Sequence, residues 1–381
     1  MSIEECRSRI DKLDDEILEL FQQRMTVAAE IAGLKKASHG AVLDRKRERE
    51  ILLKVFRSSS DNLGKYSVKL FSNLMELSRA YQRELNREAG SMGEELAKII
   101  ADTPEKFPES AIVACMGREG AYGQIAADKL FDVANIMYFH NFAGVCKAVK
   151  DGLCEYGLLP IDNTTSGTIN AVYDLLNDGD LHIVRSINLQ ISSVLLAPKG
   201  TKLSEVTEIF SHEQPFLQCS EFLKPFKERN VKFTVCSSTA AAAEYAVTCG
   251  RKNVAAIASR SCAELCNMEI LETNIQNSDY NYTRFVCISR TPQIFSGANK
   301  ISLIAVLNHQ PGALNTVLAK FAALGLNLTK LESRPIPGRK FEYMFYFDFE
   351  ASVTAPGIAE LLDELRADTE KFVFLGNYSE L

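Results

Sequence analysis

The hydrophobic pattern changes its period along the chain, and this constrains the fold more than any other sequence feature. Over residues 3–88 apolar side chains recur every three or four positions, which predicts amphipathic helices. Over residues 111–290 short apolar runs alternate with helical stretches, a pattern typical of α/β domains. Over residues 299–378 the expected elements follow the order β-α-β-β-α-β. One hydrophobic core rarely grows beyond about 250–300 residues, so the 381 residues should form several domains.

We therefore expect a multidomain protein with an all-α domain at residues 1–90, an α/β domain at 111–290 and an α+β domain of ferredoxin-like arrangement at 299–378. Residues 91–110 are polar and contain two prolines, and we interpret them as a linker.

Composition and charge argue against several classes of function. A net charge of -6 provides no field for a polyanion, so we expect no nucleic-acid partner. The first residues are charged where a signal peptide would be apolar, and no run approaches about 20 apolar residues. We therefore expect a cytoplasmic protein without a membrane segment. The ten cysteines form no C-x-x-C pair, so we expect reduced structural thiols and no metal site.

The all-α domain should contain three helices, the first more than thirty residues long. A break at Ser38-His39-Gly40 should end it, the second should run from Asp44 to about Phe56, and the third should begin near Tyr66. Because these helices are too few to bury all of their apolar faces, a homodimer or higher homo-oligomer is expected.

Two cations interrupt the apolar face of the first helix. Arg24 lies near the centre of that face, and Lys35 is rotated by only about 20° from it. A buried cation is costly unless it is paired, so an external anion would explain both residues. An internal ion pair between Glu48 and either Arg24 or Lys35 explains the two cations equally well.

The polar positions of this segment resemble those of the all-helical chorismate mutase family. The residues that carry the resemblance are Arg7, Arg24, Lys35, Asp44, Arg47, Glu48, Ser78 and Gln82. The resemblance implies an intertwined dimer that rearranges chorismate to prephenate without cofactor or metal, by pinning the dianion and stabilising charge on its ether oxygen.

The same resemblance implies individual roles. Arg7 and Arg24 would hold carboxylates, while Lys35 and Gln82 would donate to the ether oxygen. Asp44 and Glu48 would orient the ring hydroxyl or a cation, and Arg47 and Ser78 would complete the pocket. Arg7 points about 100° away from Arg24 on the same helix, which suits a residue that serves the partner's pocket. A degenerate mutase domain that acts only as a dimer scaffold is the alternative.

Several turn-like clusters follow the expected strands of the α/β domain, at residues 116–123, 160–167, 211–215, 237–239 and 282–285. Loops that open helices present free N–H groups suited to carboxylates, although a Ser or Thr there is commonly just a helix cap. We interpret His212 as a structural cap rather than a general acid.

Together the runs 160–167, 211–219 and 283–285 resemble prephenate dehydratase. The resemblance implies two α/β subdomains, like those of periplasmic binding proteins, that face a cleft in which prephenate loses water and carbon dioxide to give phenylpyruvate. It makes Thr283 the essential hydroxyl, with Asn163 and Gln218 binding the substrate and assisting. Further substrate contacts would come from Ser238, Thr239, Arg284 and Phe285.

The α/β segment also departs from the family's usual pattern. Arg118, Gly123 and Asp162 replace the common Pro, Ser and Glu, which leaves the choice between prephenate and arogenate open. A pure solute-binding module, which would need no Thr283 hydroxyl, is the rival interpretation.

The C-terminal segment resembles the amino-acid-binding ACT domain. The resemblance rests on Gly312, Ala313 and Leu314 at a helix start and on Glu332, Ser333, Arg334 and Pro335 at a strand end. It implies L-phenylalanine binding and feedback inhibition of phenylalanine biosynthesis, whereas a plain dimerisation module is the alternative.

Overall fold

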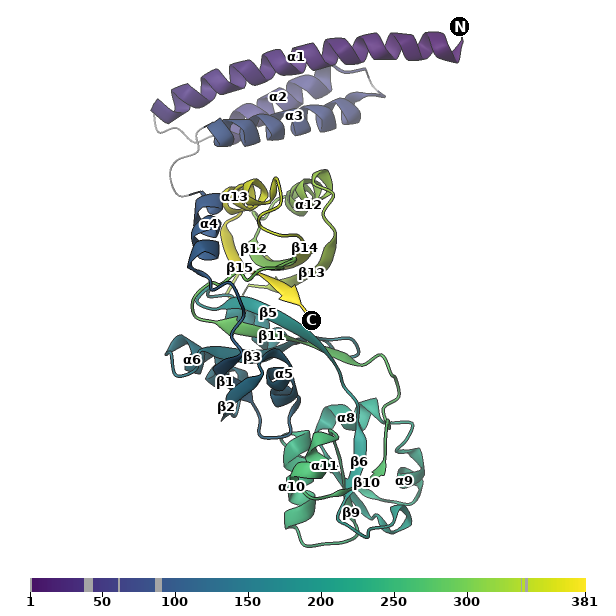
Figure 1. The fold of residues 1–381 in the computed structure, drawn as a ribbon. Helices are drawn as coiled ribbons and strands as arrows, with labels where there is room; N and C mark the ends of the chain where they lie inside the picture. The colour runs from purple at the N-terminus through teal and green to yellow at the C-terminus, as the bar shows by residue number, and fades with distance from the viewer. Residues whose placement is uncertain (1, 38–43, 61, 86–90, 337, 340–341) are drawn as a thin grey trace. The chain divides into compact units, whose positions relative to one another are not determined.

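The computed structural model describes residues 2–381 except 38–43, 61, 86–90, 337 and 340–341. The chain divides into two compact units, Met1–Ser91 and Met92–Leu381 (Figure 1). The expected break at residues 38–40 lies outside the described part of the chain.

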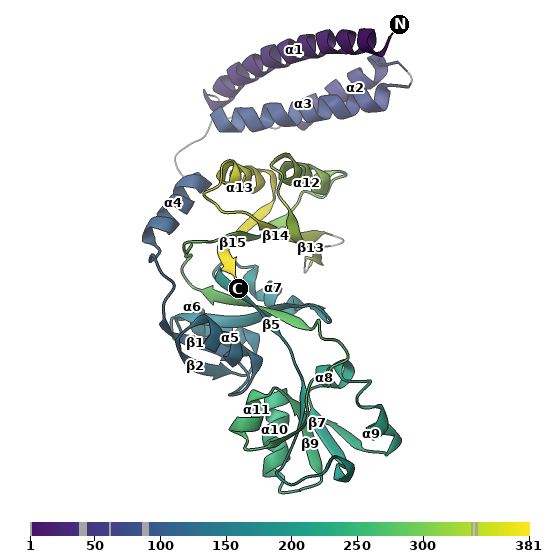
Figure 2. The same cartoon turned by 45° about the vertical axis from the view of Figure 1, so that its right-hand side comes forward.

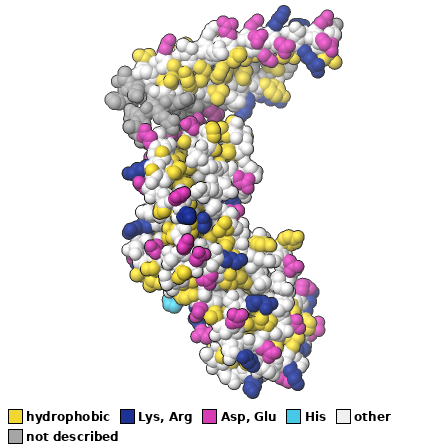
Figure 3. All heavy atoms as spheres, viewed as in Figure 1, with side chains coloured by type: hydrophobic (Ala, Val, Ile, Leu, Met, Phe, Trp, Pro, Cys, Tyr) yellow, Lys and Arg dark blue, Asp and Glu magenta, His cyan; other side chains and the backbone are white. Residues whose placement is uncertain are grey.

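The first unit consists of three helices, as predicted. They are α1 (Ile3–Ala37), α2 (Arg45–Ser58) and α3 (Gly64–Leu85). Their shared interior is small and includes Ala28 and Ala32 of α1 and Met75 of α3. Large apolar side chains of α1, among them Leu13 and Ile17, remain exposed, and yellow patches mark such side chains on this unit in Figure 3. The unit therefore presents more apolar surface than a stable isolated bundle would.

The second unit begins with a helix inside the expected linker. Helix α4 (Met92–Asp102) buries Met92 and Leu96 in the core of the C-terminal domain. Glu95 forms a two-pronged ion pair with Arg366 of α13 (Ile358–Asp368), at 2.7 and 2.8 Å. Met92, Leu96 and Ile99 recur at helical spacing, so this short apolar stripe outweighs the polar composition of the segment.

Two sheets form the α/β region. They lie in different parts of the second unit, one around β1, β2 and β5 and the other around β7 and β9 (Figure 2). The first belongs to a ten-stranded sheet of order β13-β14-β12-β15-β5-β11-β3-β1-β2, with β4 beside β3, and the second has the order β10-β6-β9-β7-β8. In the first subdomain the elements are β1 (Ser110–Met116), α5 (Tyr122–Leu130), β2 (Val133–Phe139), α6 (Phe142–Lys150), β3 (Tyr156–Asn163), β4 (Gly167–Thr168), α7 (Asn170–Leu176), β5 (His182–Gln190) and β11 (Tyr282–Ser289). In the second they are β6 (Val194–Ala197), η1 (Leu203–Glu205), β7 (Glu208–Ser211), α8 (Glu213–Gln218), α9 (Lys224–Glu228), β8 (Lys232–Val235), α10 (Thr239–Thr248), β9 (Val254–Ala258), α11 (Ser261–Leu265) and β10 (Glu269–Glu272).

The C-terminal domain has the predicted β-α-β-β-α-β order. Its elements are β12 (Lys300–Val306), α12 (Ala313–Ala323), β13 (Leu328–Pro335), β14 (Tyr343–Glu350), α13 and β15 (Lys371–Glu380). Strand β15 extends beyond the expected end and pairs in parallel with β5, with Ser379 opposite Arg185. The C-terminal domain therefore continues the sheet of the α/β domain. Gly376 allows this junction, because a Cβ there would overlap the backbone of Ile183.

Candidate active sites

In the helical unit, Arg24 meets Ser78 and the main chain of α3. Its Nη1 donates to the Leu74 carbonyl oxygen at 2.9 Å and to the Ser78 hydroxyl. Among the described residues it meets neutral oxygens and no carboxylate. Burial accordingly lowers the pKa of Arg24, and no described carboxylate offsets the loss of solvation. Gln82 is only 7% exposed, and its Oε1 has no partner in the described part of the chain. Buried polar atoms normally have partners, so this interior suits an external polar ligand.

Glu48 does not form an ion pair with Arg24. Its carboxylate instead contacts the guanidinium of Arg79, a residue that the sequence reasoning missed although it follows Ser78 directly. The internal pair between Glu48 and Arg24 is therefore not formed, while Lys35 lies half-buried further along α1.

The other polar residues of this unit are more exposed. Asp44 caps α2 by accepting a hydrogen bond from the Arg47 N–H at 3.0 Å, and the Arg47 side chain pairs with Glu50 at 3.5 Å on the surface. Arg7 is exposed and lies 17 residues before Arg24, which is about 25 Å along a helix. Arg7 is therefore too far away to join Arg24 around one small molecule within the same chain.

In the α/β region, the three residues expected to carry the chemistry lie in one polar cluster. Asn163 ends β3, and its Nδ2 donates to the Thr283 hydroxyl oxygen at 2.9 Å. Gln218 of α8 donates to Thr165 at 2.9 Å and accepts from the Asn281 amide at 3.2 Å. Asn281 links the two halves, because its Oδ1 also accepts from Asn163 at 2.9 Å. The cluster thus joins both subdomains.

Asn281 was missed by the sequence reasoning, yet a signal was present. Asn281 directly precedes β11 and lies two positions before Thr283, the spacing at which residues of an extended chain share one face. Gln214 and Ser166 extend the cluster through a hydrogen bond of 2.7 Å between Nε2 and Oγ.

This geometry leaves the Thr283 hydroxyl able to donate. Because Asn163 donates to Oγ1, the hydroxyl proton remains available for a further acceptor. Thr283 is 8% exposed, so a hydrogen bond from it acts in a poorly hydrated site. His212 caps α8, accepting from the Gln214 N–H at 3.3 Å, which confirms its structural interpretation.

Four residues expected to contact the dehydratase substrate lie elsewhere or have another local role. Ser238 caps α10 by accepting from the Ala241 N–H at 3.1 Å, and Thr239 is the first residue of that helix. Phe285 is buried in the hydrophobic core. Arg284 follows Thr283 on β11 and points to the opposite face, since successive strand residues alternate.

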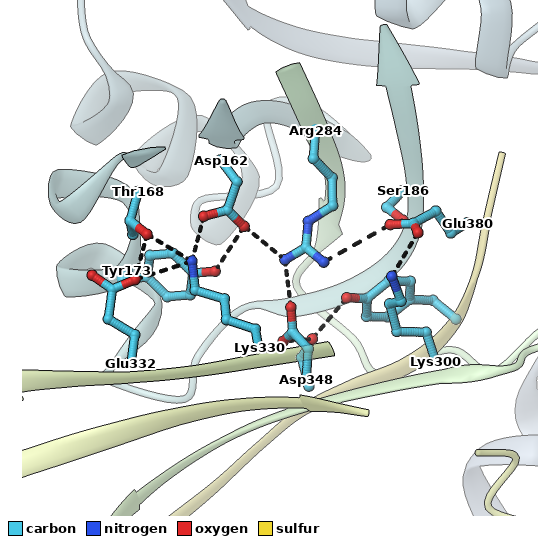
Figure 4. A network of polar contacts seen from close by, with 12 residues as sticks. Asp162, Thr168, Tyr173, Ser186, Arg284, Lys300, Lys330, Glu332, Asp348 and Glu380 are labelled. Carbon is cyan, nitrogen blue, oxygen red and sulfur yellow. Dashed lines mark hydrogen bonds and ion pairs between the residues drawn. The ribbon is translucent and has the colours of Figure 1, made fainter. Parts of the chain in front are cut away.

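Arg284 is the centre of a charged network between β11 and the C-terminal domain (Figure 4). Its guanidinium lies 2.5 Å from Asp348 of β14, 3.1 Å from Asp162 of β3 and 3.8 Å from Glu380 of β15. Desolvation works to lower the pKa of Arg284, but the surrounding negative charges, including those of Asp348 and Asp162, outweigh it and raise the pKa. The cation is thus held firmly charged.

The network continues onto strand β13. Lys330 contacts Asp162 and lies 2.7 Å from the Thr168 hydroxyl, and Glu332 contacts Thr168. Arg334 pairs with Asp174 at 2.8 Å. The side chains of Glu332 and Arg334, which the resemblance assigns to the amino-acid-binding motif, are thus engaged with the α/β domain in this structure. Ser333 and Pro335 alternate with them and are exposed.

Gly312 forms the N-terminal cap of α12 with a left-handed φ of 86°. A Cβ at this position would meet nothing within 4 Å, so the turn before Ala313 and Leu314 presents open backbone. Helix N-terminal N–H groups are suited to a carboxylate.

Neither a metal site nor a membrane-spanning helix is present among the described residues. No group of His, Cys, Asp and Glu among these residues is arranged to hold a metal ion. None of their helices is long and apolar enough to cross a membrane.

The fold and the two candidate sites together fit a multidomain enzyme with anionic small-molecule substrates. Family models agree: "Chorismate mutase type II" matches residues 6–83 and "Prephenate dehydratase" matches residues 113–293. The bifunctional chorismate mutase/prephenate dehydratase of Escherichia coli K12 is 33% identical over 386 residues, covering 98% of this chain and 95% of that protein.

Two solved structures resemble the second unit. Prephenate dehydratase from Arthrobacter aurescens in complex with L-Phe has a TM-score of 0.64 at 28% identity, covering 70% of this chain and 89% of that one. GqqA, described as a quorum-quenching acylase, has a TM-score of 0.64 at 32% identity, covering 71% and 98%. The chain belongs to the bifunctional chorismate mutase/prephenate dehydratase family. It therefore has both activities and acts in phenylalanine biosynthesis.

Proposed function

We propose that the helical unit binds chorismate at the Arg24 and Gln82 interior. The observation that carries this assignment is the desolvated guanidinium of Arg24, which meets only neutral oxygens among the described residues, beside an unpartnered buried Gln82 oxygen. Arg24 holds a carboxylate of the dianion, and Ser78 orients it. Lys35 and Gln82 donate to the ether oxygen, where negative charge grows in the cyclic transition state. Preorganised donors stabilise that charge without any nucleophile or metal.

We propose that the opposite protomer completes this site with its Arg7. The exposed apolar face of α1 supports a homodimer, and the helix length places Arg7 outside its own chain's Arg24 site. Asp44 and Glu48 orient the ring hydroxyl, and Arg79 holds the Glu48 carboxylate in place. Arg47 borders the site.

Mixing two inactive variants tests the shared site. In a heterodimer of Arg7→Ala and Lys35→Ala chains, one site carries both defects and the other carries none. If subunits exchange freely, about one quarter of the parent mutase activity should return, because about half of the dimers are mixed and each has one intact site. If Arg7 serves its own chain, every site keeps a defect and mixing restores nothing. Co-expression with two affinity tags, followed by isolation of the mixed dimer, provides the protein.

We propose that Thr283 donates its hydroxyl proton toward the leaving hydroxyl of prephenate. Asn163 and Gln218 bind the substrate and hold Thr283 and the 163–166 turn in position. Threonine is a weak acid, so it acts as a hydrogen-bond donor or relay, while aromatisation of the ring supplies driving force for loss of water and carbon dioxide. The N-terminus of α10, at Ser238 and Thr239, offers backbone N–H groups to a substrate carboxylate.

We propose that L-phenylalanine binds the C-terminal domain and inhibits dehydration. Its carboxylate meets the open backbone at Gly312, its ring lies beside Leu314, and the exposed Ser333 and Pro335 complete the site. Inhibition requires that phenylalanine favour a less active arrangement, so substrate must weaken phenylalanine binding by the same factor.

Calorimetry on the parent and Gly312→Val proteins, with matched dehydratase assays, tests this site. A valine at a φ of 86° is strained and obstructs approach to the backbone. The variant should keep both activities and lose phenylalanine binding and inhibition. Unchanged inhibition in the variant, or no phenylalanine binding by the parent, refutes the assignment.

A further inference from the structure

The two strands that carry the dehydratase cluster also carry the charged network. In the β3–β11 ladder, Thr283 pairs with Asn163 and the next residue, Arg284, pairs with Asp162. Successive strand residues point to opposite faces, so the ladder places the hydroxyl–amide pair on one face and the ion pair on the other. A shift of Arg284 or Asp162 therefore moves the same backbone that positions Thr283 and Asn163.

The ion pair is fixed from the C-terminal domain. Asp348 is almost fully buried, and its Oδ2 lies 2.5 Å from the Arg284 guanidinium. Its other oxygen accepts from the Ser302 hydroxyl at 2.5 Å, and that hydroxyl lies 2.7 Å from the Tyr378 hydroxyl. The carboxylate is thus held by neutral groups on β12 and β15 and directed at a cation on β11 (Figure 4).

We propose that Asp348 and Arg284 are positioning residues for the dehydratase, which hold Thr283 and Asn163 in register through the β3–β11 ladder. This inference rests on the proposed role of Thr283. It makes the C-terminal domain a structural part of the dehydratase site, in addition to any ligand that the domain binds. In this proposal Arg284 acts through the strand that it shares with Thr283 rather than by contact with the substrate.

The Asp348→Asn variant tests the proposal, because it removes the charge and keeps the shape. Arg284 would then be drawn toward Asp162 and Glu380, which distorts the ladder. Misplacement of catalytic groups by about 1 Å can cost about a hundredfold in rate, so kcat for dehydration should fall by about tenfold to a hundredfold, with KM for prephenate changed less than about twofold. Ser302→Ala, which only loosens Asp348, should lower kcat in the same manner by a smaller factor.

Asp368→Asn is the matched control. Asp368 pairs with buried Lys320 at 3.0 Å within the same domain and lies on α13, away from β11. This variant should lose stability and keep the parent kcat. Each variant is assayed at the same interval below its own melting temperature. If Asp368→Asn then lowers kcat as much as Asp348→Asn does, general loosening of the domain explains the effect and the proposal fails.

A double-mutant cycle with Thr283→Val separates this proposal from the assignment of Thr283 itself. If Asp348 acts through Thr283, Asp348→Asn should lower the residual rate of Thr283→Val by no more than about twofold. The full single-variant effect in that background would overturn the positioning role and leave Thr283 untouched. Parent activity in Thr283→Val alone would instead refute the assignment on which this inference rests.

Discussion

Replacing Thr283 by valine removes one hydroxyl from the dehydratase cluster and nearly preserves the side chain's shape. The hydroxyl oxygen accepts a single hydrogen bond from Asn163 Nδ2 in this structure. That amide nitrogen also lies 2.9 Å from the Asn281 oxygen and 3.1 Å from the Tyr282 carbonyl oxygen. It therefore keeps acceptors in the variant, and no buried donor is left without a partner.

The expected cost is much larger for the reaction than for the fold. Losing one ordinary hydrogen bond costs about 1 kcal/mol, which lowers the melting temperature of a domain of this size by about 2–4 °C. Losing a donor directed at developing charge costs about 10²–10³ in rate, or about 3–4 kcal/mol in the transition state. The variant should therefore stay folded while dehydration nearly stops.

The assay follows phenylpyruvate formation from supplied prephenate, together with a thermal melt. Thr283→Ser is the matched control, because it keeps the hydroxyl and should retain most of the parent rate. Mutase activity of the same polypeptide, measured with chorismate, should be unchanged in both variants. If Thr283→Val turns over prephenate at the parent rate, the hydroxyl has no catalytic role and the solute-binding interpretation of the cluster gains support.

Three further predictions concern other parts of the chain. Lys35→Ala should lower chorismate rearrangement by about 10²–10³ and leave dehydration of prephenate intact, and near-normal mutase activity in the folded variant would contradict its role. Burial works to raise the pKa of Glu208, but hydrogen bonds from Thr234, Lys232 and Arg251 lower it from 4.5 to about 2. Its folded-state pKa is depressed, so the stabilisation that it provides is complete above about pH 5 and lost on acidification toward pH 2. Denaturant titrations of Glu208→Gln should show a deficit at pH 7 that closes at low pH, and a constant deficit would contradict the linkage. Gly376→Ala should force β15 away from Ile183 and lower stability and dehydratase activity together, which parent-like melting would disprove.

The sequence predicted the architecture where each element carried its own periodic signal. The three N-terminal helices and the β-α-β-β-α-β order follow from local patterns, and the structure confirms them. Helix α4 was interpreted as part of a linker, because its apolar stripe is short and is buried only where it packs against α13. The pairing of β15 with β5 was also missed, because it joins residues nearly 200 positions apart and leaves no local trace.

In the candidate dehydratase site, too, local sequence patterns were informative and contacts between distant residues were not. Asn163, Gln218 and Thr283 lie in one cluster, as the resemblance implied, while their part in the reaction stays a prediction. Arg284 was placed beside Thr283 in the substrate site, although strand alternation alone indicates the opposite face. Asp348 lies between two phenylalanines in a largely aromatic strand, which signals a buried charge, but the identity of its partner depends on how two domains pack.

The presence of two separate active sites is tested most directly by adding chorismate to the purified protein. Prephenate and phenylpyruvate are then followed separately, with and without phenylalanine. The parent should form prephenate and then phenylpyruvate, and phenylalanine should suppress the second product while prephenate accumulates. In Thr283→Val prephenate should accumulate without phenylalanine, and Lys35→Ala should form neither product from chorismate yet convert added prephenate. Loss of both activities in either folded variant would contradict the claim that the chain contains two separate active sites.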